Sequence, residues 1–427
     1  MIREHLRQLW AGLWFAPALI SGTLLIFALL ASNLLGWSPL FLVTETHSFD
    51  HDQAQSLLTS LAATSISVTT LLLSLTMVVL TTASSQFGPR LIPIFMMKTG
   101  TKVSIGLFVG LFAYQATVAT ALTHQRSVPD LAIWIGAIGS LASFIILLFF
   151  IHMVSRFIQV PHMVNEVSNS LHKALLDYIS KPDQAKAASQ SLPPSFQDYQ
   201  SLTLASPRSG YLQRIDIPTL VKWATQNDTL ITARHRAGQF IAKDEALLST
   251  RLQDPEADDS PLRPLASSFI IGPQRSNSQD IEHAIRQLVE IAARALSPGI
   301  NDFYTAINVI ERLGAALREI IDDPLPKGLW YDDEQKLRLH IPLLGPAELL
   351  AAAFDPLRQN ARSNEATAFS LMNLYLHLAE ARPHPDFRDA LRHHADLLLS
   401  DCQDTIPCEH DRDELAKLHQ RTLKALS

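Results

Sequence analysis

The 427-residue chain has little cysteine and, in its first third, little charge. It has only two cysteines, Cys402 and Cys408, which excludes a fold stabilised by several disulfide bonds. Residues 1–159 hold only seven Lys and Arg and five Asp and Glu, although the whole chain has 35 and 41. The remainder is mildly acidic. This distribution excludes a fully soluble enzyme and a disordered protein, and it lacks the basic face expected of a nucleic-acid binder.

The sequence also lacks the short motifs of the common enzyme classes. It contains no GxxxxGK[ST] phosphate loop, no GxGxxG, no GxSxG and no HExxH. The spacing of Cys402, Cys408 and His410 matches no zinc pattern. We therefore predict that the protein is not an enzyme, with no catalytic residues, no metal and no cofactor.

The first third contains four long apolar stretches. A bilayer core about 30 Å thick requires about 20 apolar helical residues. Stretches at about residues 13–35, 57–82, 103–122 and 131–158 meet that requirement. Because lipid offers the backbone no hydrogen-bonding partner, each stretch must be a helix. The sequence thus predicts a polytopic transmembrane domain of four helices over residues 1–159.

The basic residues of this domain indicate its orientation. With the N-terminus inside, all of its Lys and Arg except Arg126 fall in inner segments. The first outer loop is then acidic, with Glu45, Asp50 and Asp52. We expect both the N-terminus and the C-terminal part of the chain to be cytoplasmic.

Beyond residue 159 the patterns are those of a cytoplasmic α+β domain. Residues 160–199 predict a connecting helix and a linker. Short alternating runs between Pro, Gly and Asn residues predict a small β-rich module, barrel-like or sandwich-like, over residues 200–255. Residues 265–427 predict a mainly helical part.

Three local features of the helical part are expected from its capping residues and turns. Asn277 and Asp280 resemble a capping box at the start of a helix. Asn301 or Asp302 is expected to cap the next helix. Residues 329–341 are expected to form a β-hairpin.

The second apolar stretch carries hydroxyl side chains along one face. At about 100° per residue, the face comprises Ser60, Thr64, Ser67, Thr70, Ser74 and Thr81, interrupted by Leu71 and Val78. We call these eight residues the hydroxyl stripe. It is suited to line a water-filled pathway in which the two apolar residues gate by dewetting. The alternative is tight helix packing through small hydroxyl residues, which a weaker set on the opposite face favours: Ser65, Thr69 and Thr76.

Four residues at the inner membrane face are candidates for coupling the spans to the cytoplasmic part. Gln86 and Arg90 flank a Gly-Pro helix stop after the second span. His152 and Arg156 lie one turn apart near the end of the fourth. Ionisable groups within spans are often functional, whereas anchors that reach the interface are the structural alternative.

A candidate ligand site surrounds the turn at residues 295–302. A Pro-Gly turn before a helix cap would present backbone N–H groups to an anion, and it would equally form an ordinary corner between two helices. The candidate ligand-binding residues are Arg275, Gln279, Asp280, Ser297, Asn301 and Asp302.

Several segments together resemble a family of bacterial predicted membrane proteins, catalogued as domain of unknown function 2254. They are SSQFGPR at 84–90, SGYLQ at 209–213, QD at 279–280 and ALSPGIND at 295–302. Two departures are visible: Gly88 stands where Ser is usual, and Phe303 stands where Pro usually follows Asn-Asp. The resemblance implies this membrane architecture and a bacterial inner-membrane location. It implies no activity and no catalytic residues.

We therefore predict a homo-oligomeric channel or pore for ions or small solutes, because four helices alone rarely enclose a pathway. The second span would face the axis, and the cytoplasmic domain would assemble the oligomer or sense a ligand. The alternative is a membrane-anchored regulatory or ligand-binding protein without transport activity. The expected partners are the lipid bilayer, further copies of the chain and a small ligand or ion, with no nucleic acid.

Overall fold

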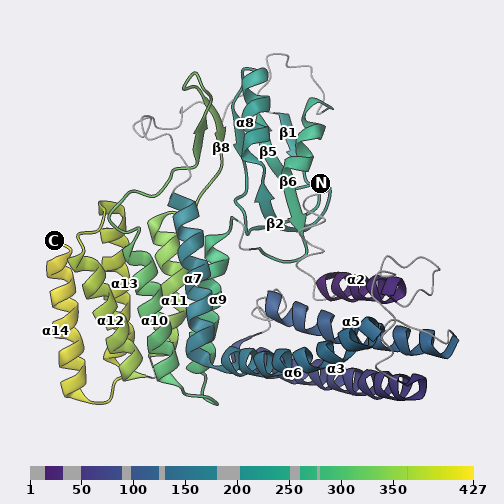
Figure 1. Ribbon diagram of the computed structural model, residues 1–427. Helices are drawn as coiled ribbons and strands as arrows, with labels where there is room; N and C mark the ends of the chain where they lie inside the picture. The colour runs from purple at the N-terminus through teal and green to yellow at the C-terminus, as the bar shows by residue number, and fades with distance from the viewer. Residues whose placement is uncertain are drawn as a thin grey trace. The chain divides into compact units, whose positions relative to one another are not determined.

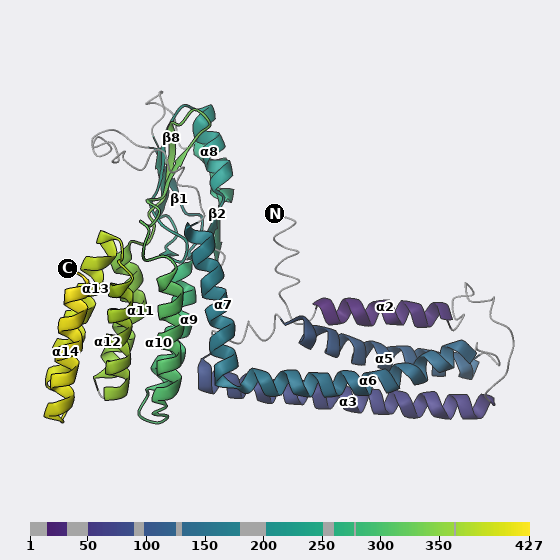
Figure 2. The ribbon, with the colours of Figure 1, turned by 60° about the vertical axis from the view of Figure 1, so that its left-hand side comes forward.

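The computed structural model describes residues 15–31, 50–88, 98–124, 130–179, 202–250, 260–276, 279–362 and 364–427. The chain divides into two compact units, Met1–Met163 and Val164–Ser427. The first is a group of long helices, and the second combines small sheets with a row of helices (Figures 1 and 2).

Helix α5 is the centre of the first unit. The described helices of this unit are α2 (Phe15–Ala31), α3 (His51–Phe87), α5 (Thr99–His124) and α6 (Asp130–Ile158). Each of the other three packs against α5. A Cβ atom on Gly106 would lie 2.9 Å from Cα of Pro17, and one on Gly110 would lie 3.0 Å from Cα of Ser21. The two glycines therefore let α2 and α5 approach closely.

Three described helices are long and apolar enough to cross a membrane: His51–Ser85, Thr99–Thr123 and Asp130–Arg156. Helix α2 is also apolar, but its described part is only 17 residues long. The remainder of the first predicted stretch, 13–14 and 32–35, lies outside the described residues. The prediction of an apolar helical membrane domain is confirmed, with three crossing helices described rather than four.

Helix α3 extends beyond the predicted range of 57–82 at both ends. Asp50 caps its start, with a side-chain oxygen 3.0 Å from the backbone N of His51. Gly88 caps its end at a φ of 101° and donates its N–H to the carbonyl of Ser84. Glycine adopts this left-handed conformation at little steric cost, so the Gly that departs from the family pattern is a good helix terminator.

The second unit contains two sheets. A five-stranded sheet has the order β1-β5-β3-β8-β7, and a three-stranded sheet has the order β4-β2-β6. All neighbouring strands are antiparallel except β3 and β8, which are parallel. The strands are β1 (Leu202–Ala205), β2 (Gly210–Ile215), β3 (Ile231–Ala233), β4 (Phe240–Ile241), β5 (Ala246–Thr250), β6 (Phe269–Gly272), β7 (Leu329–Tyr331) and β8 (Leu337–His340). The strand-rich region thus draws on more of the chain than residues 200–255.

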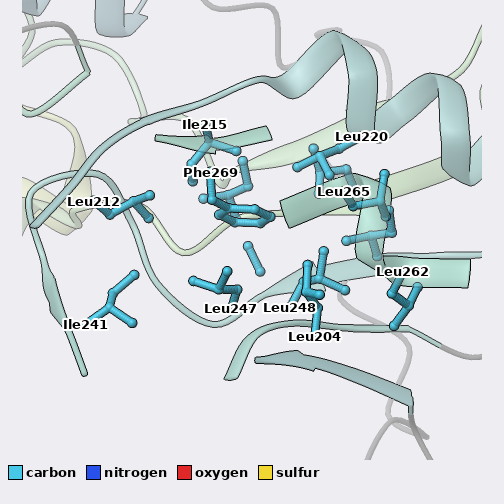
Figure 3. Close-up of a cluster of buried hydrophobic side chains, with 14 of the residues drawn as sticks. Leu204, Leu212, Ile215, Leu220, Ile241, Leu247, Leu248, Leu262, Leu265 and Phe269 are labelled. Carbon is cyan, nitrogen blue, oxygen red and sulfur yellow. The ribbon is translucent and has the colours of Figure 1, made fainter. Parts of the chain in front are cut away.

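One hydrophobic core serves both sheets. Helix α8 (Ile217–Gln226) and the 3-10 helix η2 (Ser260–Ser268) contribute Leu220 and Leu265 to it. Figure 3 shows their side chains converging with those of Phe269, Leu212 and Leu248 from the strands. Alternate strand residues point to one face, so residues widely separated in the sequence share this core.

The remaining helices form a packed array. They are α7 (Val160–Ile179), α9 (Ile281–Ala295), α10 (Phe303–Arg318), α11 (Pro346–Ala361), α12 (Glu365–Glu380), α13 (Pro385–Gln403) and α14 (Glu409–Ala425). Helix α9 packs against α10 and α11, α10 against α12, α11 against α13, and α12 and α13 against α14. The second unit is thus a mixed domain of small sheets and helices, as the sequence predicts.

Candidate functional site

The hydroxyl stripe lies on the exposed face of α3. All eight of its residues are exposed, including Leu71 at 60% and Val78 at 59%. The opposite face of α3 is buried against its neighbours and contains Ser65, Thr69 and Thr76. The two polar sets that the sequence distinguishes therefore have different surroundings: the weaker set packs within the subunit, and the stripe faces outward.

Four of the six stripe hydroxyls donate to carbonyl groups of their own helix. Thr64 bonds to the carbonyl of Ser60 at 2.9 Å, Ser67 to that of Ala63 at 2.8 Å, and Thr70 to that of Ile66 at 3.0 Å. Thr81 bonds to the carbonyl of Val78 in the same way. A hydroxyl that donates its proton in this manner keeps its lone pairs free to accept. The stripe consequently presents a row of acceptor oxygens.

The outward face of α6 contrasts with that of α3. Its exposed large side chains are apolar over several turns: Trp134, Ile138, Leu141, Phe144, Ile145, Leu148, Phe149 and Ile151. Such a face suits contact with lipid tails. The described membrane unit thus has an apolar outer face on α6 and a hydroxyl-bearing outer face on α3.

A polar contact inside this unit is absent from the sequence-based candidates. Gln115 of α5 is buried; its Oε1 accepts from the hydroxyl of Ser65, and its Nε2 donates to Ser140 Oγ at 2.6 Å and to the carbonyl of Gly136 at 3.1 Å. It links α3, α5 and α6. The sequence does contain a signal for this contact: Gln115 is an amide side chain within a predicted span.

The coupling candidates are only partly described. His152 and Arg156 are exposed on α6. The side chain of Gln86, and Arg90 altogether, lie outside the described residues. The structure therefore describes only the second pair, His152 and Arg156, which lie one turn apart on α6.

The six ligand-binding candidates fall into two groups at opposite ends of α9. Arg275, Gln279 and Asp280 precede its first residue, Ile281, whereas Ser297, Asn301 and Asp302 follow its last, Ala295. A helix of 15 residues is about 22 Å long. The hypothesis that all six complete one site is therefore wrong, because a straight helix separates the two groups.

The charged side chains at the start of α9 are already paired with one another. Arg275 donates to both oxygens of Asp280, from Nε at 2.7 Å and from Nη2 at 2.9 Å, and its Nη2 lies 3.3 Å from Glu282 Oε2. Asp280, not Asn277, caps α9 by accepting from the N–H of His283. Residue 277 itself lies outside the described residues.

The same ion pairs set the pKa values of the cluster. Burial opposes the charge of Glu282, but hydrogen bonding and charge from Arg286 together with the charges of Arg275 and Arg236 outweigh it, and the pKa of Glu282 is lowered. Burial likewise opposes the charge of Arg275, and the bonds to Asp280 outweigh it, so its pKa is raised. Both shifts favour the charged forms of Glu282 and Arg275.

Gln279 has a structural task beside this cluster. Its side-chain oxygen accepts from the backbone N of Ile215 at 2.9 Å, and its Nε2 donates to the carbonyl of the same residue at 3.1 Å. This pair of bonds imitates a strand partner and fastens the start of α9 to the end of β2.

The residues at the end of α9 form a corner whose polar groups are hydrogen-bonded within the turn itself. Ser297 donates its hydroxyl to the carbonyl of Arg294, and the N–H groups of Ile300 and Asn301 both donate to the carbonyl of Ser297. Asp302 caps α10 by accepting from the N–H of Thr305 at 3.1 Å, which confirms one of the two predicted caps. These N–H groups are used internally, so the corner is structural and does not offer the expected anion site.

A further buried polar cluster joins α11, α12 and α13. Arg358 and Arg362 of α11 both donate to Asp401 of α13. Tyr375 Oη and His394 Nδ1 are buried without a hydrogen-bond partner among the described residues. Burial lowers the pKa of His394 to about 4 and raises that of the Cys402 thiol. The sequence gives no indication of this cluster, since its members are scattered over three helices.

These features define the protein as a polytopic membrane protein with an attached α+β domain. Residues 10–376 match the family described as Predicted membrane protein (DUF2254). The chain belongs to this family, as the segments quoted above suggest.

Similar proteins include uncharacterised proteins of Mycobacterium tuberculosis, from strains CDC 1551 and H37Rv, and one of Mycobacterium bovis. Each is 28% identical over 367 residues, which cover 84% of this chain and 70% of the relative. No solved structure matches the chain.

Proposed function

We propose that the protein is a homo-oligomeric channel or pore for ions or small solutes in the bacterial inner membrane. In this proposal four helices cross the bilayer, with α2 completed as a span, and both termini are cytoplasmic. The hydroxyl stripe of α3 faces an axis shared between subunits. The observation that carries the proposal is the exposure of the whole stripe on a helix whose opposite hydroxyl set, Ser65, Thr69 and Thr76, is buried.

The contrast between α3 and α6 supports this arrangement. The apolar outer face of α6 satisfies the requirement for contact with lipid tails. The outer face of α3 gains less from lipid, because its hydroxyl oxygens retain unused acceptor capacity. Facing a second copy of α3 across hydrated space would use that capacity. Within a single subunit, α5 occupies the centre of the helix group, so the proposed pathway runs between subunits.

The chemistry of the stripe favours cations or neutral solutes over anions. Thr64, Ser67 and Thr70 have already committed their protons to backbone carbonyls. Oxygen lone pairs can replace part of the hydration shell of a cation, whereas an anion would require donors. Leu71 and Val78 would form the apolar constriction between the hydroxyl groups.

Replacement of the constriction tests the proposal. In liposomes that contain the full-length protein, Leu71→Ser and Val78→Ser should raise the flux of a monovalent cation, because a polar constriction stays hydrated. The matched control is Leu141→Ser, which makes the same change at an exposed leucine of α6 and should leave flux unchanged. Equal flux for Leu71→Ser and Leu141→Ser, or a strictly monomeric protein in mild detergent, would contradict the proposal.

A further inference from the structure

The corner between α9 and α10 carries exposed apolar side chains in the second unit. Tyr304 is 74% exposed and Ile300 is 51% exposed. Phe303 lies between them in sequence and stacks at a tilt against Tyr304, with ring centroids 4.3 Å apart. The other exposed large hydrophobic side chains of this unit, among the described residues, are Leu176 and Phe240, on other elements. The corner is thus a local concentration of apolar surface.

Polar contacts rather than these side chains hold the turn of the corner. Its turn is held by the backbone bonds to Ser297 and by the cap of Asp302. A Cβ atom on Gly299 would have no atom within 4 Å, so the tip is open on its outer side. Exposed apolar residues that do not support their own fold indicate contact with another apolar phase.

The position of the corner within the second unit identifies that phase. Tyr178, in the last turn of α7, lines the same small cavity as Asp280 and Ile281 at the start of α9. Both views show α7 and α9 side by side (Figures 1 and 2). From Ile281 to the corner α9 runs about 22 Å, and a similar length of α7 leads back from Tyr178 to about Val164. The corner therefore lies level with the first turns of α7.

The first turns of α7 are close to the membrane because α7 directly follows α6 in the chain. Helix α6 ends at Ile158 and α7 begins at Val160, and α6 contains one of the candidate membrane spans. The His172–Glu319 contact of 2.8 Å, between α7 and the end of α10, is consistent with the same alignment, because it places the start of α10 toward the start of α7.

We propose that this corner, with Ile300, Phe303 and Tyr304, is a membrane-contact tip that inserts into the interfacial region of the bilayer. Tyrosine suits this environment because its ring is apolar and its hydroxyl remains hydrated. The tip would give the second unit an attachment to the bilayer in addition to its covalent connection to α6. This inference does not depend on pore activity, because an anchored protein without transport could use the same contact.

Depth-dependent fluorescence quenching tests the tip. Cys408 is exposed and Cys402 is buried. A full-length Cys408→Ser variant should therefore react little with a thiol-reactive dye. Adding Tyr304→Cys to this variant allows a nitrobenzoxadiazole label to be attached at the tip. In phosphatidylcholine vesicles that contain a lipid with a nitroxide near its headgroup, the label should lose about half of its emission, since interfacial groups lie about 5–10 Å deep.

Two further variants make the outcome decisive. Phe240→Cys labels a 58% exposed apolar position on β4 of the same unit, and its emission should be unaffected by the nitroxide lipid. Adding Ile300→Asp to the Tyr304→Cys chain should abolish the quenching, because a charge opposes insertion. Equal quenching at positions 240 and 304, or none at 304, would overturn the proposal.

Discussion

The hydroxyl of Ser65 on α3 donates a hydrogen bond of 2.8 Å to the side-chain oxygen of Gln115 on α5. Gln115 in turn donates to Ser140 and to the carbonyl of Gly136 on α6. Three helices thus meet at one buried amide. A polar group within a membrane unit needs internal partners, because lipid supplies none.

Replacement of Gln115 by Leu should destabilise the membrane unit. The variant loses the hydrogen bonds across three helices and leaves the hydroxyl of Ser65 without its acceptor, for an expected cost of about 1–2 kcal/mol. Unfolding in a titration with dodecyl sulfate, followed by circular dichroism, measures the change. Ser67→Ala is the matched control, because its exposed hydroxyl bonds only to the carbonyl of Ala63 in its own helix. Equal midpoints for the two variants would argue against the amide as a link.

Substitution of Gly238 should be far more costly than substitution of Gly299. Gly238 has a φ of 93°, and a Cβ atom there would lie 2.2 Å from Asp280 Oδ2. Asp280 cannot move aside easily, because Arg275 and the cap of α9 hold it. Gly238→Ala should therefore lose at least about 2 kcal/mol of stability. Gly299→Ala, with nothing within 4 Å of the added methyl, should have a melting temperature near that of the parent protein.

Local patterns predicted the elements of this fold better than their pairing. The membrane spans follow from apolar length, and residues 329–341 form the expected hairpin of β7 and β8. What the pattern could not reveal is that β8 lies parallel to β3, with Ile231 opposite Leu339. Buried Arg338 explains this placement, since it pairs with Asp332 in its own hairpin and with Asp228 just before β3. Such a contact depends on tertiary structure.

For the candidate sites too, features that follow from local periodicity were predicted and features that depend on tertiary structure were not. The face of the hydroxyl stripe could be computed from helical periodicity, because α3 is one regular helix. The proposed ligand site failed because its residues precede and follow one helix, and the length of that helix keeps the two groups apart. Arg275 and Ser297 flank the same helix and are still separated by its length. Asp280 also serves as a cap rather than an interior residue, since Arg275 holds its carboxylate at the helix start.

Removal of Asp401 should destabilise the helical array strongly. Arg358, whose side chain is 10% exposed, depends on this carboxylate. Asp401→Ala would leave a largely buried guanidinium without its main partner, at a cost of about 3–5 kcal/mol. Asp322→Ala breaks the exposed pair with Arg318 and should cost less than about 1 kcal/mol. Thermal unfolding of both variants in detergent decides between a structural ion pair and a dispensable one.

The stability of the helical array should fall on mild acidification because of His394. Burial lowers its pKa from 6.5 to about 4, and Asp355 at 3.7 Å offsets this only in part. Between these two pH values the unfolded chain binds a proton that the folded chain does not. Stability is therefore complete above pH 6.5 and declines by up to about 3 kcal/mol as the pH falls to 4.

The groups that face this imidazole are Asp355 and Arg358 on α11, Tyr375 on α12 and His393 beside it on α13. His394→Phe should flatten the decline between pH 6.5 and 4, because it removes the titrating group and retains an aromatic ring against Phe354. His393→Phe is the matched control, since His393 is exposed and adjacent, and it should keep the decline. Chemical unfolding at a series of pH values provides the comparison, and identical pH profiles for the two variants would assign the effect to other groups.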